Sequence, residues 1–188
     1  MQNCGAIILA AGGSSRLGEP KQLLMFGGET LLARTARIAL ESKAAPVVVV
    51  LGAHAEECAA AMAGQPVRMV KNSAWREGIA SSIRAGVASL TEEVDAVVIL
   101  LCDQPGVSPA LIDRLITATR DIAACEYGGT TGPPVCFAKK YFKELLALEG
   151  EKGAKSLLSK YADILETVPF PGGEWDVDLP DDRKRLVE

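Results

Sequence analysis

A glycine-rich segment near the N-terminus combines a flexible turn with two cations. It runs from Leu9 to Lys21 with the sequence LAAGGSSRLGEPK and overlaps the end of the apolar run Ala6–Ala11. A glycine-rich turn after the first strand of a parallel sheet exposes backbone N–H groups at the edge of the sheet where ligands bind. Arg16 and Lys21 would then be within reach of a triphosphate. The alternative is a surface turn with solvated charges.

Two common phosphate-binding motifs do not describe this segment. It contains no GxGxxG sequence, so the dinucleotide-binding fingerprint is absent. Gly13 and Gly18 have the GxxxxG spacing of a Walker loop, but Glu19-Pro20 stands where that loop needs Lys-Ser/Thr. What remains is a flexible loop that carries Arg16 and Lys21, two cations able to reach a triphosphate.

A second polar cluster, NSAWREGIASS over residues 72–82, enters a predicted helix. Apolar residues at helical spacing after Gly78 face inward, which leaves Ser81 and Ser82 near the helix start and able to bond a ligand. The alternative is that the glycine and the serines only cap the helix. Trp75 either covers a ligand ring or is a half-buried core residue, and the second interpretation is favoured.

Acidic residues at two places are candidates for binding a divalent cation. Asp103 follows the buried run Ala96–Leu101, at the sheet edge where ligands collect. A hard oxygen donor there suits Mg²⁺, which uses one or two protein carboxylates together with phosphates. Asp176 and Asp178 alternate and so point the same way on an extended segment. In either place the acids could instead cap a turn or a helix.

Alternating strands and helices must position these groups. Strands buried on both faces are predicted from three nearly continuous apolar runs, Ala6–Ala11, Val47–Leu51 and Ala96–Leu101. Apolar residues at helical spacing begin near Thr30, after Gly78, and after Ser108-Pro109, where Ser caps and Pro takes the first helical position. This alternation predicts an α/β fold with a mainly parallel sheet.

The second half of the chain is less regular. The sequence GGTTGPP over residues 128–134 predicts a loop, followed by a short extended run, Val135–Ala138. Helices are predicted over Lys139–Leu148, Gly153–Tyr161 and Pro180–Val187. No internal repeat or low-complexity linker is present, so a single domain over residues 1–188 is expected.

Composition excludes several classes of function. The chain has 20 basic and 24 acidic residues, whereas a nucleic-acid-binding protein usually has a basic excess. The longest near-apolar run, Ala44 to Ala53, is far shorter than the roughly 18 residues of a membrane span. Five cysteines without a CxxC spacing argue against a disulfide framework or structural zinc, and a cytoplasmic location is expected. Cys102 is interpreted as a buried filler and His54 as structural.

The pattern Leu-Ala-Ala-Gly-x-Ser-x-Arg-x-Gly-x-x-Lys, which starts at Leu9, resembles the signature loop of nucleotidyltransferases. Within these it is most similar to the molybdenum cofactor cytidylyltransferase family, and further stretches such as Asp103-Gln104-Pro105 follow in the family's order. The resemblance implies a three-layer α/β/α, Rossmann-like nucleotide-diphospho-sugar transferase fold. Leu17 stands where Met is common, and Leu179 stands where Thr is usual, which are departures from the family pattern.

The resemblance also implies roles for individual residues. Catalytic roles fall to Lys21, Arg16 and Asp103. The nucleotide is expected to contact Leu9, Ala10, Ala11, Gly12, Gly13, Asn72, Gly78, Ser81 and Ser82. The metal is expected on Asp103 and Asp178, with Asp176 as the second choice to Asp178. The second substrate, or acceptor, is expected near Gln104, Gly132, Pro133 and Lys155, although Lys155 replaces the family's Arg and lacks its bidentate fork.

The implied reaction is Mg²⁺-dependent transfer of CMP from CTP to molybdopterin, with release of pyrophosphate. The sequence Leu-Ala-Ala-Gly is that of cytidylyl members, where guanylyl relatives have Leu-Ala-Gly-Gly. Two alternatives remain open. One is a nucleotidyltransferase that uses GTP or another nucleotide and a sugar or alcohol phosphate. The other is a carrier that delivers a nucleotide cofactor to a molybdoenzyme without chemistry.

Overall fold

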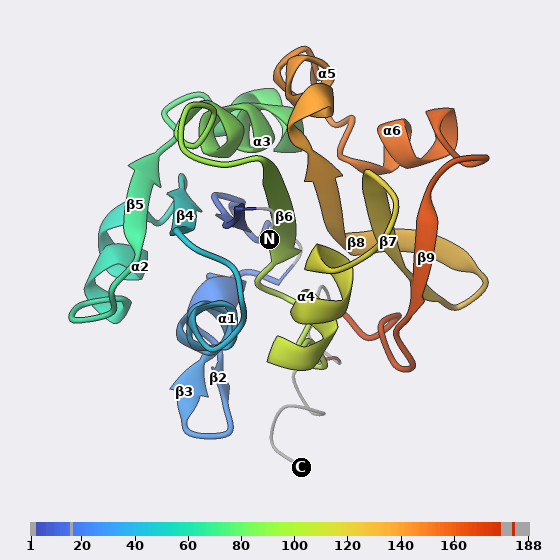
Figure 1. The fold of residues 1–188 in the computed structure, drawn as a ribbon. Helices are drawn as coiled ribbons and strands as arrows, with labels where there is room; N and C mark the ends of the chain where they lie inside the picture. Colours follow the sequence, from blue (N-terminus) through green and yellow to red (C-terminus); the bar gives the residue numbers. More distant parts are fainter. Residues whose placement is uncertain (1–2, 16, 178–181, 183–188) are drawn as a thin grey trace.

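The computed structural model describes residues 3–15, 17–177 and 182, and a seven-stranded sheet runs through its centre (Figure 1). The strand order is β5-β4-β1-β6-β8-β7-β9. The strands are β1 (Cys4–Ala10), β4 (Val47–Leu51), β5 (Arg68–Lys71), β6 (Ala96–Leu101), β7 (Ile122–Tyr127), β8 (Thr130–Ala138) and β9 (Glu166–Pro169). Only β8 runs antiparallel to its neighbours, so the sheet is mainly parallel as predicted. A small hairpin, β2 (Met25–Phe26) and β3 (Glu29–Thr30), stands apart from the sheet.

Helices cover both faces of the sheet. The α-helices are α1 (Leu31–Leu40), α2 (Ala55–Ala61), α3 (Ile79–Ala88), α4 (Pro109–Ile116), α5 (Phe142–Leu146) and α6 (Lys155–Lys160). Short 3₁₀ turns form η1 (Lys21–Leu23), η2 (Trp75–Glu77) and η3 (Lys139–Tyr141). Figure 1 shows α1 and α4 on one face and α3, α5 and α6 on the other, which gives three layers. No helix in the described ranges has the length and apolarity needed to cross a membrane.

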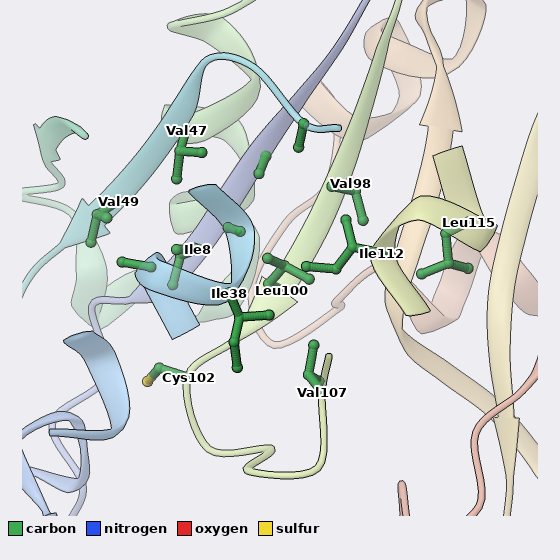
Figure 2. Close-up of a cluster of buried hydrophobic side chains, with 14 of the residues drawn as sticks. Ile8, Ile38, Val47, Val49, Val98, Leu100, Cys102, Val107, Ile112 and Leu115 are labelled. Carbon is green, nitrogen blue, oxygen red and sulfur yellow. The ribbon is translucent and has the colours of Figure 1, made fainter. Parts of the chain in front are cut away.

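The continuous apolar runs are explained by burial on both faces. Ile8 of β1 packs with Ile38 of α1 and Ile112 of α4 in one cluster (Figure 2). Its neighbour Ile7 points to the opposite face and joins a second cluster with Ile83 of α3. Because successive strand residues point to opposite faces, a strand between two helical layers has no polar position. The three predicted strands are therefore confirmed.

Helix starts agree with the capping signals. The Thr30 side chain accepts a hydrogen bond from the Ala33 N–H at the start of α1. The Ser108 side chain accepts one from the Leu111 N–H, with Pro109 as the first residue of α4. Each cap satisfies one backbone donor that the helix leaves unpaired. Both predicted starts are confirmed.

The predicted loop over residues 128–134 is wrong. Residues 130–134 belong to β8, and only Gly128 and Gly129, both with positive φ, form the turn from β7. Proline cannot donate to a ladder, and is tolerated in a strand at a bulge. The pairing of β7 with β8 shifts register between Ala124 and Cys125, opposite the two prolines, so no ladder bond is required of them.

The remaining helices differ in extent from the predictions. The segment predicted as one helix over Lys139–Leu148 divides into η3 and α5, and α6 is shorter than Gly153–Tyr161. The closing helix predicted over Pro180–Val187 lies outside the described residues, apart from residue 182.

Gly86 tests how tightly α3 packs on the sheet. A Cβ at this position would lie 2.4 Å from Ile7 Cγ2 and 3.2 Å from Val50 Cγ2. We expect Gly86→Ala to lower the free energy of unfolding by about 1–3 kcal/mol through overpacking, although Gly to Ala inside a helix usually adds about 0.5–1 kcal/mol. Urea unfolding measures this free energy. The control is Ala88→Gly at an exposed position of the same helix, where the substitution changes helix propensity alone. A gain in stability from Gly86→Ala would contradict the described packing.

Candidate active site

A cavity of about 610 Å³ opens at the carboxyl ends of β1 and β6. Its walls come from the segment after β1, from η1, from the start of α3, from the end of β6 and from the loop before α6. The lining residues are Leu9, Ala11, Gly12, Gly13, Lys21, Gln22, Trp75, Arg76, Gly78, Ile79, Ser82, Leu101, Cys102, Asp103 and Glu151. This is the edge of a parallel sheet at which ligands bind.

The cavity brings together residues from three separate predicted motifs. Eight candidate site residues line it, namely Leu9, Ala11, Gly12, Gly13, Lys21, Gly78, Ser82 and Asp103. The cavity lining does not include Ala10, Asn72, Ser81, Gln104, Gly132, Pro133 or Lys155. Arg16 and Asp178 lie outside the described residues. Asp176 is described, and is exposed.

The glycine-rich loop presents backbone to the cavity. Within residues 3–15, 17–177 and 182, the N–H groups of Gly12 and Gly13 donate no hydrogen bond. A Cβ on Gly13 would lie 3.3 Å from the Trp75 ring, so a side chain there would be crowded. Free N–H groups on a glycine turn form an anion-binding concavity. The loop can therefore bind phosphate oxygens through its backbone.

Lys21 and Asp103 form an ion pair across the cavity floor. The Lys21 Nζ donates to Asp103 Oδ2, and the two side chains are only 20% and 10% exposed. Asp103 Oδ1 is buried and has no hydrogen-bond partner in the described part of the chain. A carboxylate oxygen accepts but does not donate, and leaving one buried without a partner costs about 1–3 kcal/mol. The site thus holds an open anionic oxygen beside a cation.

This open oxygen fits a divalent cation. Mg²⁺ prefers oxygen ligands and is usually held by one or two carboxylates plus substrate phosphates. No group of three or more His, Cys, Asp or Glu side chains forms a complete metal cage within the described ranges. Asp103 is therefore suited to a metal that arrives with phosphate ligands.

Cys102 lines the cavity, whereas the sole histidine, His54, does not. Burial raises the pKa of Cys102 to about 12, with a further contribution from the negative charge of Asp103. The thiol therefore stays protonated at neutral pH and is no nucleophile. His54 precedes α2, and its Nδ1 lies 3.2 Å from Glu57 Oε2. All five cysteines are buried and unbridged.

The polar cluster at the start of α3 is organised by Asn72. Its Nδ2 donates to Ser81 Oγ at 2.8 Å and to Ser82 Oγ at 3.1 Å. Ser81 Oγ donates in turn to the Gly78 carbonyl at 2.8 Å, and Asn72 Oδ1 accepts from the Ala74 N–H at 3.0 Å. Ser81 therefore spends its hydroxyl proton inside the protein, and Ser82 alone of these two serines reaches the cavity.

Gly78 brings the loop before α6 to the cavity. Its φ is +102°, and a Cβ there would lie 2.4 Å from the Gly150 carbonyl oxygen. The same oxygen accepts a hydrogen bond from the Ala80 N–H at 3.1 Å. Only glycine permits both this φ and this approach. The contact places Glu151 on the cavity wall beside Gly78, two residues after Arg76, which stacks 4.4 Å over the Trp75 ring.

None of the four residues predicted for the acceptor lines the cavity, and only Gln104 directly follows a lining residue, Asp103. Gln104 is buried, and its Nε2 donates to the carbonyls of Pro133 at 3.1 Å and Gly173 at 3.4 Å. Gly132 is buried against Tyr127, and Lys155 is an exposed residue at the start of α6. In the structure, Gln104 therefore joins three segments behind Asp103.

Sequence reasoning missed several lining residues, chiefly Gln22, Arg76 and Glu151. Because Gln22 adjoins Lys21, its position near the cavity could have been predicted, but nothing in the sequence indicated that its side chain is buried. Glu151 lies four residues before Lys155, the predicted acceptor residue, which was the signal for this part of the chain.

Known proteins share similarity with this chain in sequence and in structure. Residues 6–164 match the family described as MobA-like NTP transferase domain. The chain is 36% identical over 132 residues to nicotine blue oxidoreductase of Paenarthrobacter nicotinovorans, covering 69% of this chain and 64% of that protein. It is 31% identical over 121 residues to a probable molybdenum cofactor guanylyltransferase of Bacillus mycoides, covering 63% and 58%. The matches thus span less than two thirds of these two relatives.

A solved structure extends the likeness to nearly the whole chain. The crystal structure of Rv0371c from Mycobacterium tuberculosis superposes with a TM-score of 0.88 and 32% identity, covering 99% of this chain and 98% of that one. The same protein has been solved in complex with manganese, and that structure superposes with a TM-score of 0.83 and 30% identity, covering 99% and 98%. The three-layer fold and the family match over residues 6–164 lead to one conclusion: the chain belongs to the MobA-like NTP transferase family.

Proposed function

We propose that the protein is a Mg²⁺-dependent nucleotidyltransferase that transfers CMP from CTP to molybdopterin and releases pyrophosphate. The observation that carries the proposal is the Lys21–Asp103 pair, with the open Oδ1 of Asp103, beside the free N–H groups of Gly12 and Gly13. Together these groups offer a cation, a metal ligand and an anion-binding turn at one cavity. That combination matches the needs of phosphoryl chemistry, which depends on positioning and charge neutralisation.

In the proposed reaction, an oxygen of the acceptor phosphate attacks the α-phosphorus of the nucleoside triphosphate in line. The bond between the α-phosphorus and the bridging oxygen breaks, and pyrophosphate leaves with the electron pair. Lys21 stabilises the charge on the triphosphate, Arg16 adds a second cation, and the loop N–H groups orient the phosphates. Mg²⁺ bound by Asp103 and Asp178 would neutralise charge on the phosphate oxygens. An ionised acceptor phosphate needs no general base.

The choice of CTP rests on the loop sequence. Ala11 is buried on the cavity wall, at the position where guanylyl relatives have glycine. A single methyl group in a pocket is worth about 1–3 kcal/mol of discrimination, so other wall residues must contribute. The remaining contacts to the nucleoside are proposed to come from Ser82, together with Asn72 and Ser81, which are hydrogen-bonded behind it. We place the acceptor beside Gln104, Gly132, Pro133 and Lys155, with a molybdoenzyme as the recipient of the product.

Of the two alternative functions, one has specific support. The probable guanylyltransferase of Bacillus mycoides favours GTP as the alternative nucleotide. A carrier without chemistry would also need a nucleotide cavity, but it would gain nothing from a cation and a metal carboxylate at its floor. The Lys21–Asp103 pair therefore favours an enzyme.

Pyrophosphate release tests the proposal. The protein is incubated with Mg²⁺, molybdopterin and each of CTP, GTP, ATP and UTP in turn. We expect release with CTP and a nucleotide-bearing molybdopterin product of the corresponding mass. Release with GTP alone would replace CTP by GTP in the proposal. Binding of nucleotide without release, for every nucleotide and acceptor tried, would favour the carrier.

A further inference from the structure

Gln22 is a buried polar residue whose side chain reaches back to the glycine-rich loop. It lies in η1, directly after Lys21, and is 1% exposed. Its Nε2 donates to the carbonyls of Ala10 at 3.1 Å and Gly12 at 2.8 Å. Its Oε1 accepts from Ser14 Oγ at 3.3 Å. One carboxamide therefore holds three points of the loop.

These bonds determine which way the loop peptides face. A trans peptide group is planar, with its C=O and the following N–H on opposite sides. Because Gln22 holds the Gly12 carbonyl, the N–H of Gly13 must point away from the Gln22 amide. The intervening Ala11 carbonyl faces another partner, the Ala53 N–H at 3.1 Å. Hydrogen bonds to the Ala11 and Gly12 carbonyls therefore determine which way the N–H groups of Gly12 and Gly13 point.

Ser14 connects the same loop to the turn that carries Lys21. Its φ is +50°, the only positive value at a non-glycine residue in the described part of the chain. Its Oγ accepts from the Lys21 backbone N–H at 3.0 Å, and its carbonyl accepts from the N–H groups of Leu17 and Gly18. A serine held in this conformation is strained unless its surroundings fix it. The hydroxyl bonds to Lys21 and Gln22 provide that fixation.

We propose that Gln22 is a positioning residue for phosphate binding: it holds the Gly12 carbonyl so that the N–H of Gly13 stays directed at the phosphates of the nucleotide, beside the N–H of Gly12, which the bond between the Ala11 carbonyl and the Ala53 N–H orients. The inference rests on the proposed function and deepens it. A glutamine is required because its carboxamide both donates twice and accepts once at this place. Glutamate would set an oxygen against two carbonyl oxygens, and methionine would fill the space without donating.

Tripolyphosphate binding tests this role without depending on turnover. The variants are Gln22→Met and Gln22→Glu, and the matched control is Gln65→Met, a partly buried glutamine outside the cavity. We expect the Kd for tripolyphosphate with Mg²⁺, measured by calorimetry, to rise about 10- to 100-fold in both Gln22 variants, as for loss of one charge-assisted hydrogen bond. The control should bind like the wild type. Thermal unfolding establishes that each variant is folded. A residue with only a structural role would lower the Tm of its variants without changing their Kd.

A folded Gln22→Met variant that binds tripolyphosphate like the wild type would overturn the proposal. If the variants do not fold, the wild-type protein labelled with ¹⁵N-glycine provides the test. Tripolyphosphate should shift the amide resonances of Gly12 and Gly13, and unchanged resonances at saturation would also overturn it. The proposed function fails separately, through absence of pyrophosphate release by a wild-type protein that still binds tripolyphosphate.

Discussion

Asp103→Asn is expected to lower kcat by at least about 10³-fold, because loss of a bound metal removes several kcal/mol of transition-state stabilisation. The substitution preserves the size of the side chain and removes the charge that pairs with Lys21. It also replaces the carboxylate, the proposed metal ligand, whose buried Oδ1 lacks a hydrogen-bond partner among the described residues. Steady-state pyrophosphate release gives kcat, and titration with Mn²⁺ gives the metal affinity, which should fall as well.

Asp121→Asn is the matched control for Asp103→Asn. Asp121 pairs with Lys140 at 2.5 Å on the exposed surface, where solvent screening leaves such a pair little effect on stability. Its loss should leave kcat and metal affinity at wild-type values. If Asp103→Asn retained full activity and full Mn²⁺ affinity, the metal site would have to be elsewhere.

Lys21→Ala is expected to lower kcat by about 10²–10³-fold, the usual effect of removing one group that stabilises transition-state charge. The Lys21 side chain reaches Asp103 on the cavity floor, so its charge lies where the triphosphate is proposed to bind. Stability should change little in the presence of Mg²⁺, because the metal replaces the lysine as the partner of the carboxylate. Single-turnover kinetics and urea unfolding measure the two quantities.

Lys140→Ala removes the exposed partner of Asp121 and serves as the control for Lys21→Ala. Activity of that variant should equal the wild type. A Lys21→Ala protein that reacts at the full rate would show that the Lys21 side chain has no role in catalysis.

The parallel half of the fold was predictable because its strands are buried on both faces. Ala6–Ala11, Val47–Leu51 and Ala96–Leu101 contain no polar residue, and a strand between two helical layers allows none. The strand β8 was not predictable in the same way. Its first residues, TTGPP, have the composition of a loop, and only the shifted register opposite Cys125 makes the prolines compatible with pairing.

The meeting of Lys21 and Asp103 at one cavity was predictable for a related reason. Lys21 and Asp103 are 82 residues apart, yet each follows a parallel strand whose carboxyl end lies at the same sheet edge. Glu151 reaches the cavity through the contact between Gly78 and the Gly150 carbonyl, which no local pattern encodes. Gln22 carried no signal of burial, because a single polar residue beside a lysine usually faces solvent.

The hydrogen bonds of Gln104 make it a poor residue to substitute in a test of the proposed acceptor region. Its amide joins the segment after β6 to Pro133 and Gly173, so its loss would move Asp103 as well as any acceptor contact. Substitution of the exposed Lys155 therefore gives the cleaner test of the acceptor region.

The carboxylate of Asp103 and the glycine-rich loop are proposed to bind one metal–triphosphate complex. The most direct test is a crystal structure of the protein with Mn²⁺ and a CTP analogue that cannot be cleaved between the α- and β-phosphates. We predict an anomalous manganese peak bonded to Asp103, with phosphate oxygens accepting from the N–H groups of Gly12 and Gly13. Nucleotide bound with its phosphates away from this loop, or manganese bound without Asp103, would contradict the account.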